Sequence, residues 1–201
     1  NDGMLHAFNA GTGREMLAYV PKCLFSHLPL LTETGDASRH RYFVDGSAFT
    51  GDVFTHQRNR DGSANTARPK SYLAGSLGAG GRGYFVLDVT APQNFCTAQP
   101  SELLVLDQSL DATESFAASD PKAWIGHIMA APVVDQVDTR FSSQLVRMND
   151  GRWALVMGHG YNSQNDPAAR LIQFLDGAKG LKVIPASPAE PLRPCYAVAA
   201  R

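Results

Sequence analysis

Short apolar runs alternate with glycine-rich or polar turns along most of the chain. Runs rich in aromatic and β-branched residues, bounded by such turns, are typical of β-strands. They predict strands over 41–46, 51–54, 71–75, 84–89, 131–137 and 143–148. Amphipathic patterns with helical spacing are scarce, and the best candidate for a short helix covers 103–119. The pattern therefore predicts an all-β protein with few short helices.

A longer pattern repeats along the chain: apolar residues, then Asn or Asp, then a turn that closes on Gly or Pro. Its three copies are HAFNAGTG (6–13), FVLDVTAP (85–92) and QFLDGAKG (173–180). A second echo joins NDGMLHAF (1–8) to NDGRWALV (149–156). Asn-Asp-Gly before an apolar run is a hairpin signal, because Asn and Gly tolerate the positive φ that primed turns require.

Many short strands within a long repeat predict a partial or modified β-propeller with long loop insertions. Residues 1–201 hold about two and a half sheet repeats, whereas propellers typically have at least four blades. We therefore expect part of a β-propeller domain, either a piece of a longer exported protein or a chain that pairs with another copy. The polar insertion 55–70 and the region 93–123 are the expected partner contacts, since recognition tends to lie on loops held by a scaffold.

Composition narrows the function classes. The 201 residues are 44% hydrophobic and 18% charged, with a formal net charge of −1, which is typical of a globular chain. This balance gives no electrostatic reason to propose nucleic acid or an anionic membrane as a partner. The longest apolar runs are too short to span a bilayer, so no transmembrane segment is expected. The first residues lack the charged start and apolar run of a signal peptide.

The stretch GSLGAGGRGYFVLDV (75–89) contains G-x-G-x-x-G at Gly78, Gly80 and Gly83. A dinucleotide loop needs these glycines after a strand and before a helix, whose N-terminus then binds the pyrophosphate. Here they precede an aromatic and β-branched run that favours a strand. The segment is therefore interpreted as a glycine turn that leads into a strand, and no nucleotide cofactor is predicted.

The three cysteines, Cys23, Cys96 and Cys195, lie far apart and form no C-x-x-C pair, which argues against a structural zinc site. One disulfide with one free thiol and three reduced thiols both remain open from the sequence.

The remaining polar residues predict no catalytic, cofactor-binding or metal-binding site in this chain. Asp135 and Asp138 are interpreted as a solvated turn, because Arg140 and Phe141 stand where a calcium loop needs oxygen donors. The histidines form no helical i, i+4 pair, and His159 between two glycines is the one most open to a pocket. No G-x-S-x-G elbow marks a nucleophilic serine. The six histidines are His6, His27, His40, His56, His127 and His159.

Four stretches resemble the type IV pilus tip-associated adhesins of the PilC/PilY family, in their C-terminal β-propeller region. They are NDGMLHAFNAGTGREMLAYVP (1–21), YFVDG with GDVF (42–54), LAGSLGAGGRGYFVLDVTAP (73–92) and GRWALVMGHGYNS (151–163). The resemblance implies a non-enzymatic role in pilus assembly and surface attachment, with pilin or minor pilins and a host or surface receptor as partners. It also implies export to the periplasm, the outer membrane surface or the pilus tip of a Gram-negative bacterium. The acidic calcium loop of some family members has no counterpart here, so no calcium ligand is transferred.

An enzymatic alternative is a quinoprotein-like propeller oxidoreductase, whose blades carry turns similar to HAFNAGTG. The shared feature reflects turn physics, because a carboxamide or carboxylate caps the bend and glycine completes it. The resemblance to such enzymes would also imply two further features: a docking tryptophan in each blade and an acidic site that binds calcium and the quinone. Only Trp124 and Trp153 are present.

Overall fold

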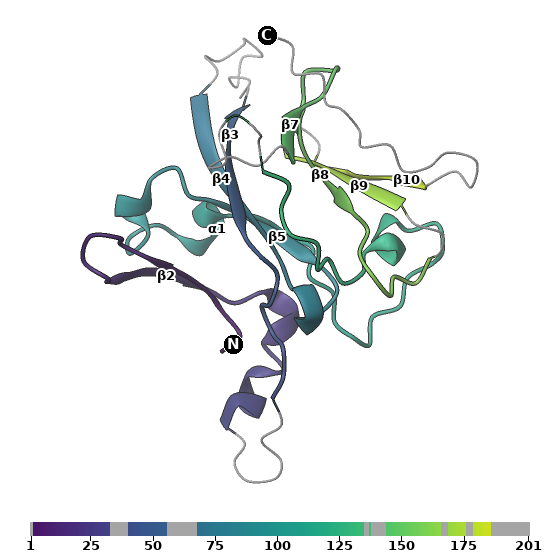
Figure 1. The fold of residues 1–201 in the computed structure, drawn as a ribbon, viewed down its shortest axis with the longest axis horizontal. Coiled ribbons are helices and arrows are strands. Elements are labelled where there is room, and N and C mark those ends of the chain that lie inside the picture. Colours follow the sequence, from purple (N-terminus) through teal and green to yellow (C-terminus); the bar gives the residue numbers. More distant parts are fainter. Residues whose placement is uncertain are drawn as a thin grey trace.

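A computed structural model gives the fold of the chain in the ranges 2–32, 40–55, 68–134, 137, 144–165, 169–175 and 179–185. Within these ranges the strands form one two-stranded hairpin and two four-stranded antiparallel sheets. Figure 1 shows the hairpin beside the first sheet, and the second sheet on the other side of it. The all-β prediction is confirmed.

The hairpin consists of β1 (Leu5–Phe8) and β2 (Glu15–Tyr19). Asn9 closes it: its backbone N–H donates to Arg14 O at 2.8 Å, and its side-chain Oδ1 accepts from the N–H groups of Gly11 and Thr12 at 3.0 and 2.9 Å. A side-chain carbonyl that accepts from the backbone two or three residues ahead fixes a tight turn. This is why the repeated pattern places Asn or Asp directly after the apolar residues.

The first sheet has the order β3-β4-β5-β6. Its inner strand β5 is buried from Tyr84 to Leu87, which matches its unbroken run of aromatic and β-branched residues. The strands are β3 (Phe49–Thr55), β4 (Arg68–Ser76), β5 (Tyr84–Asp88) and β6 (Leu104–Asp107).

The second sheet has the order β10-β9-β8-β7. The turn Asn149-Asp150-Gly151 joins β7 to β8, as the sequence predicts. Gly151 has φ +86°, and Met148 N–H donates to Arg152 O at 2.7 Å. The strands are β7 (Leu145–Arg147), β8 (Trp153–Gly158), β9 (Ala169–Phe174) and β10 (Leu181–Pro185).

The three copies of the repeated pattern occupy equivalent places in the fold. In chain order, each copy begins in the second-to-last strand of its sheet. These strands are β1 before β2, β5 before β6, and β9 before β10. The repeat therefore marks one kind of strand.

The first sheet is covered on both faces. On one face of β5, Tyr84 and Val86 belong to the main core cluster together with Leu155 and Leu171 of the second sheet. On the other face, the ring of Phe85 lies 4.9 Å from that of Tyr19 in the hairpin. Successive side chains of a strand point to opposite faces, so burial of consecutive residues requires a layer on each side. The sheets therefore pack face to face in chain order.

Helices are short in the described residues. They are α1 (Pro100–Leu103) and the 3-10 turns η1 (Lys22–Leu24), η2 (Leu28–Thr32), η4 (Gly78–Gly80), η5 (Pro92–Asn94) and η6 (Pro121–Trp124). No helix in this part of the chain is long and apolar enough to cross a membrane.

The expected helix over 103–119 is wrong. Only Leu103 ends a helix, and Leu104–Asp107 form β6, which pairs with β5 through Leu106 and Asp107. Pro100 starts α1 at the position where proline is tolerated, but the following residues gain more by completing the sheet.

Two expected strands are also absent. Residues 41–46 are irregular, because they pack against the glycine segment 77–83 between β4 and β5. Asp45 N–H donates to Leu77 O at 3.1 Å. Within the expected strand 131–137, residues 131–133 and Val137 are irregular, Val134 forms only a bridge, and Asp135 and Gln136 lie outside the described residues. The other expected strands coincide with β3, β4, β5 and β7, and most of the insertion 55–70 lies outside the described ranges.

Candidate functional site

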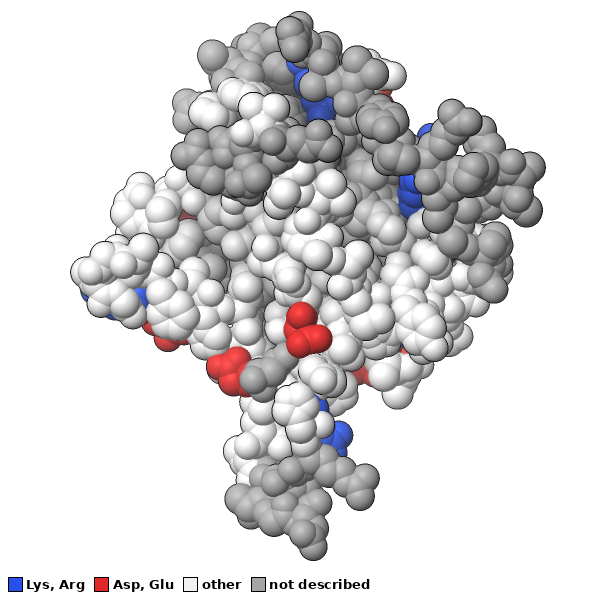
Figure 2. Space-filling model, viewed as in Figure 1, with Lys and Arg blue, Asp and Glu red and all other residues white. Residues whose placement is uncertain are grey.

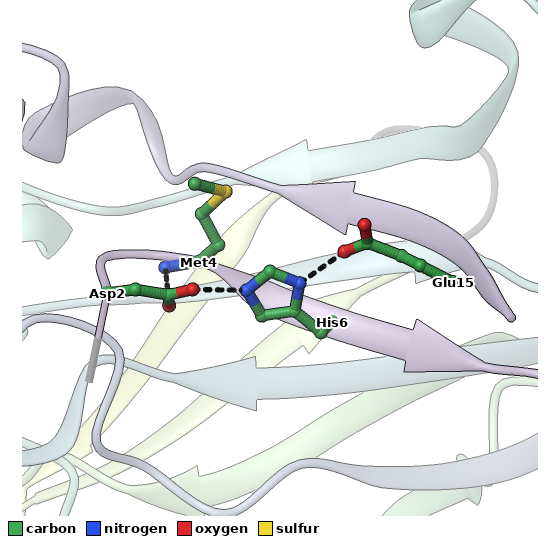
Figure 3. A network of polar contacts seen from close by, with 4 residues as sticks. All are labelled: Asp2, Met4, His6 and Glu15. Atoms are coloured by element: carbon green, nitrogen blue, oxygen red, sulfur yellow. Dashed lines mark hydrogen bonds and ion pairs between the residues drawn. The ribbon is translucent and has the colours of Figure 1, made fainter. Parts of the chain in front are cut away.

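A network of polar side-chain contacts surrounds His6 on the outward face of the hairpin (Figure 3). Nε2 of the imidazole lies 2.6 Å from Oδ2 of Asp2, and Nδ1 is hydrogen-bonded to Oε1 of Glu15. Asp2 also accepts from the N–H of Met4 at 3.2 Å through Oδ1. Both nitrogens of one imidazole therefore face carboxylates from two different segments.

The electrostatics follow from these contacts. The hydrogen bonds that His6 makes to the Glu15 carboxylate and then to the Asp2 carboxylate raise the pKa of His6, since both favour the charged ring. Partial burial works to raise the pKa of Asp2, but the hydrogen bonds from His6 and Met4 outweigh it and hold that pKa below its usual range. In this cluster, named here the His6 network (Asp2, Met4, His6 and Glu15), both ring nitrogens face acceptors, an arrangement that favours the charged ring.

A second feature is the glycine segment between β4 and β5. A Cβ on Gly80 would lie 1.8 Å from Phe43 O, and one on Gly78 would lie 2.7 Å from Gly46 N. Gly78 and Gly83 also have positive φ values of +57° and +133°. The glycines therefore serve close backbone packing, and they lead into strand β5 as the sequence predicts.

The linker 126–128 joins the two sheets at this point. Gly126 N–H donates to His159 O at 2.7 Å, while Gly126 O accepts from Gly83 N–H at 3.2 Å. Nδ1 of His127 lies 3.0 Å from Gly78 O. Ser76 Oγ donates to Ile128 O at 2.7 Å in a buried position. The linker thus contacts the β4–β5 turn on one side and the β8–β9 turn on the other.

A pocket of about 490 Å³ lies beside this junction. Hydrogen bonds fix part of its wall: Gln164 Nε2 donates to Ser115 Oγ at 3.1 Å, and Arg82 Nη2 donates to the backbone carbonyls of Asp111 and Glu114 at 3.2 and 2.8 Å. The lining includes Cys23, His27, Gly81, Arg82, His127 and Gln164.

The residues singled out in the sequence are spread over the fold. His159 is half-buried, and its backbone binds Gly126 and Ala169. His40 stacks edge-on against Tyr42 at 4.8 Å. Asp135, Asp138 and His56 lie outside the described residues. Among the residues that the structure describes, no group of three or more His, Cys, Asp and Glu side chains could hold a metal ion.

One possible disulfide bond, between Cys23 and Cys96, is absent. Cys23 is buried and Cys96 is exposed, and both are free thiols, so the two do not pair with each other. Burial raises the pKa of the Cys23 thiol, although the hydrogen bond to Ser109 opposes the shift. Cys195 lies outside the described residues.

The sequence reasoning missed the His6 network. The histidine pattern did not single out His6, although Asp2 stands four residues before it and Glu15 begins the partner strand. A hairpin over 5–19 brings Glu15 opposite Phe8, two residues from His6 and on the same face. The register of the hairpin is therefore the signal that could have found the network.

Charge is sparse on the face shown in Figure 2. Acidic side chains form a few separate spots in its lower half, basic ones are scattered, and uncharged residues cover most of the described surface. This face carries no basic patch over the described residues, which fits the near-zero net charge.

Consecutive four-stranded antiparallel sheets, packed face to face in chain order, are the arrangement of blades in a β-propeller. Comparison with known proteins agrees with this class: residues 1–184 match the family model described as the PilY1 beta-propeller domain. The chain belongs to this family.

Named relatives extend the match. The chain is 36% identical over 181 residues to the type IV pilus biogenesis factor PilY1 of Pseudomonas aeruginosa strain UCBPP-PA14, covering 90% of the chain and 12% of the relative. It is 34% identical over 172 residues to a PilY1 homolog of Xylella fastidiosa strain Temecula1, covering 86% and 9%. The chain thus spans about an eighth or less of the length of these relatives.

A solved structure agrees as well. The crystal structure of the Pseudomonas aeruginosa PilY1 C-terminal domain is similar with a TM-score of 0.55 and 30% sequence identity. The similarity covers 95% of this chain and 30% of that one. The prediction of a partial or modified β-propeller of the PilC/PilY family is therefore confirmed.

Proposed function

We propose that the protein acts without catalysis in type IV pilus biogenesis and in surface attachment at the pilus tip, with this chain as a rigid propeller segment. The observation that carries the proposal is the family match over residues 1–184 together with relatives that are themselves type IV pilus biogenesis factors. The role in biogenesis rests on the names of these relatives, and the role in surface attachment extends the proposal beyond those names.

The same relatives support the partners and the compartment. Pilus biogenesis factors act where pili are built, so pilin or minor pilins are the proposed partners inside the cell envelope. A host or surface receptor is the proposed partner outside it. The proposed location is the periplasm, the outer membrane surface or the pilus tip of a Gram-negative bacterium.

The non-enzymatic part of the proposal also rests on these relatives, whose names describe pilus biogenesis factors rather than enzymes.

Deletion of the gene in the source bacterium tests the proposal. Pilin in the sheared surface fraction measures assembly, and attachment to an abiotic surface measures adhesion, each with the complete gene returned as a control. Loss of surface pilin supports the biogenesis role; normal surface pilin overturns it. Loss of attachment in cells that keep normal pili would separate the adhesin role from assembly. A quinone absorbance band with dye-linked oxidation of an alcohol or sugar would instead support the oxidoreductase alternative.

A further inference from the structure

We infer that the His6 network is a proton-operated clamp, which holds the β1–β2 hairpin closed when His6 is protonated and releases its start when the proton leaves. The inference concerns this hairpin alone and does not depend on the proposed role in pilus biogenesis. It rests on which atoms face each other around the imidazole (Figure 3).

Hydrogen-bond chemistry sets the two states. An imidazolium ion carries two N–H donors, whereas neutral imidazole carries one donor and one lone pair. In the structure both ring nitrogens face carboxylate oxygens, which can only accept: Asp2 at 2.6 Å and Glu15 on the other side. Loss of the proton therefore turns one of the two contacts into a lone pair against a carboxylate. It also leaves two negative charges without the positive charge between them.

The position of the network gives this change a mechanical effect. His6 and Phe8 point to the outward face of the hairpin, and their rings stack at 5.9 Å. Through His6, the network ties the segment before β1 to the first residue of β2. The opposite face of the hairpin binds the first sheet through Tyr19. The clamp thus governs how firmly β1 and the segment before it are held to β2. The inner face of the hairpin stays anchored to the first sheet.

The charged groups that face His6 are few. Asp2 comes from the segment before β1 and Glu15 from β2, and these two are its electrostatic partners. Asp107, which lies against the inner side of the hairpin, accepts from Tyr19 Oη and from the backbone N–H of Lys22 rather than from His6. Proton loss at His6 is therefore not compensated by another cation in the network.

The pKa values of His6 and Asp2 set the pH range in which the clamp is closed. The folded pKa of His6 is raised, so its stabilisation is complete below about 6.5, the value of an unperturbed histidine, and is lost as the pH rises through the raised value. The folded pKa of Asp2 is lowered, so its contribution is present above its usual value and is lost as the pH falls. The clamp is closed between these limits and opens on the alkaline side.

NMR titration of the isotope-labelled chain tests the clamp. The ring signals of His6 report its protonation, and amide hydrogen exchange in Leu5–Phe8 and Ala18–Tyr19, corrected for the intrinsic pH effect, reports hairpin closure. His127 is the internal control, because its Nδ1 faces a backbone carbonyl rather than a carboxylate. The matched variants are Asp2→Asn, Glu15→Gln and the double variant, which keep side-chain size and remove charge.

We expect His6 to titrate at a higher pH than in any of the variants, with the double variant lowest. Hairpin protection should fall across the His6 midpoint in the unmodified chain and stay level in the double variant. Equal His6 midpoints in the unmodified chain and the double variant would overturn the clamp. Hairpin protection that does not change across the measured midpoint would overturn it as well, and this second readout needs no variant to fold.

Discussion

The phenolic hydroxyl of Tyr84 donates a 2.8 Å hydrogen bond to Oε1 of Gln173 in the core between the two four-stranded sheets. Tyr84 is 1% exposed and Gln173 is fully buried. Burial also raises the pKa of Tyr84, so the hydroxyl stays a donor. Nε2 of Gln173 donates to Phe174 O at 3.0 Å. The pair joins β5 of one sheet to β9 of the next and leaves neither side-chain oxygen unsatisfied in the dry interior.

Replacing Tyr84 with Phe tests this pair. The variant keeps the ring but leaves Gln173 Oε1 without its donor, so we expect a loss of about 1–3 kcal/mol in the free energy of unfolding. The double variant Tyr84→Phe/Gln173→Leu removes both polar partners and should lose less than the sum of the single changes. Urea denaturation measures each value. Additive losses would show that the two side chains do not interact.

Tyr19 and Asp107 anchor the hairpin to the first sheet. Oδ2 of Asp107 accepts from Tyr19 Oη at 2.6 Å and from Lys22 N–H at 2.8 Å, and Oδ1 accepts from Ser109 N–H at 2.8 Å. We expect Asp107→Ala to destabilise the chain more than Tyr19→Phe, which removes one of the three bonds and costs about 1.5–3 kcal/mol. Amide exchange in β1 and β2 should rise in both. Exchange that rises equally across the second sheet would contradict a local anchor.

Gly80 should not tolerate a side chain. A Cβ there would lie 1.8 Å from Phe43 O, a backbone atom that cannot move aside cheaply. We expect Gly80→Ala to lose more than about 3 kcal/mol, at or beyond the upper end of ordinary overpacking. Gly158→Ala is the matched control, since its Cβ would meet nothing within 4 Å and Gly158 has no positive φ. Thermal unfolding compares the two variants. Similar stabilities would refute the close-packing role of the glycine segment.

The Lys70–Asp88 pair predicts an acid-dependent contribution. Burial works to raise the pKa of Asp88, but hydrogen bonds from Lys70 and Thr90 outweigh it and hold the pKa below its usual range. Lys70 Nζ lies 2.6 Å from Oδ2 of Asp88. A lowered folded pKa means stability that is present above about 3.9 and lost as the pH falls through the folded value.

Acid denaturation of Lys70→Met and of the unmodified chain tests this pair. The variant should unfold at a higher pH, because Asp88 then takes up its proton more readily. Asp88→Asn should show a smaller dependence of stability on pH in the same range. Identical acid midpoints in all three chains would rule the pair out as a source of acid sensitivity.

Much of the fold could be predicted from local chemistry. The runs 51–54, 71–75 and 84–89 coincide with strands because aromatic and β-branched residues fit a pleated, buried surface. The Asn-Asp-Gly turn at 149–151 follows from the backbone freedom of its last residue. Residues 104–107 were missed because their strand exists only through pairing with β5, which the local pattern does not encode.

The candidate site was harder to predict. The His6 network depends on the register of β1 against β2, with an irregularity between Ala7 and Phe8 that shifts Glu15 along the partner strand. Gly80 cannot carry a side chain because its backbone packs against that of Phe43, which is far away in the sequence. Among the glycines of this segment, Gly78 and Gly83 have positive φ, whereas Gly80 and Gly81 do not. Long-range contacts of this kind leave no periodic signal.

Complementation of the deletion strain tests the central claim most directly: that this propeller segment supports type IV pilus biogenesis. The complete gene carries either Gly80→Val, which breaks the glycine packing, or the control Gly158→Ala. Pilin is then measured in the sheared surface fraction. We predict that the control restores surface pilin to the level of the unmodified gene and that Gly80→Val does not. Equal restoration by the two variants, or surface pilin that never fell on deletion, would contradict the account.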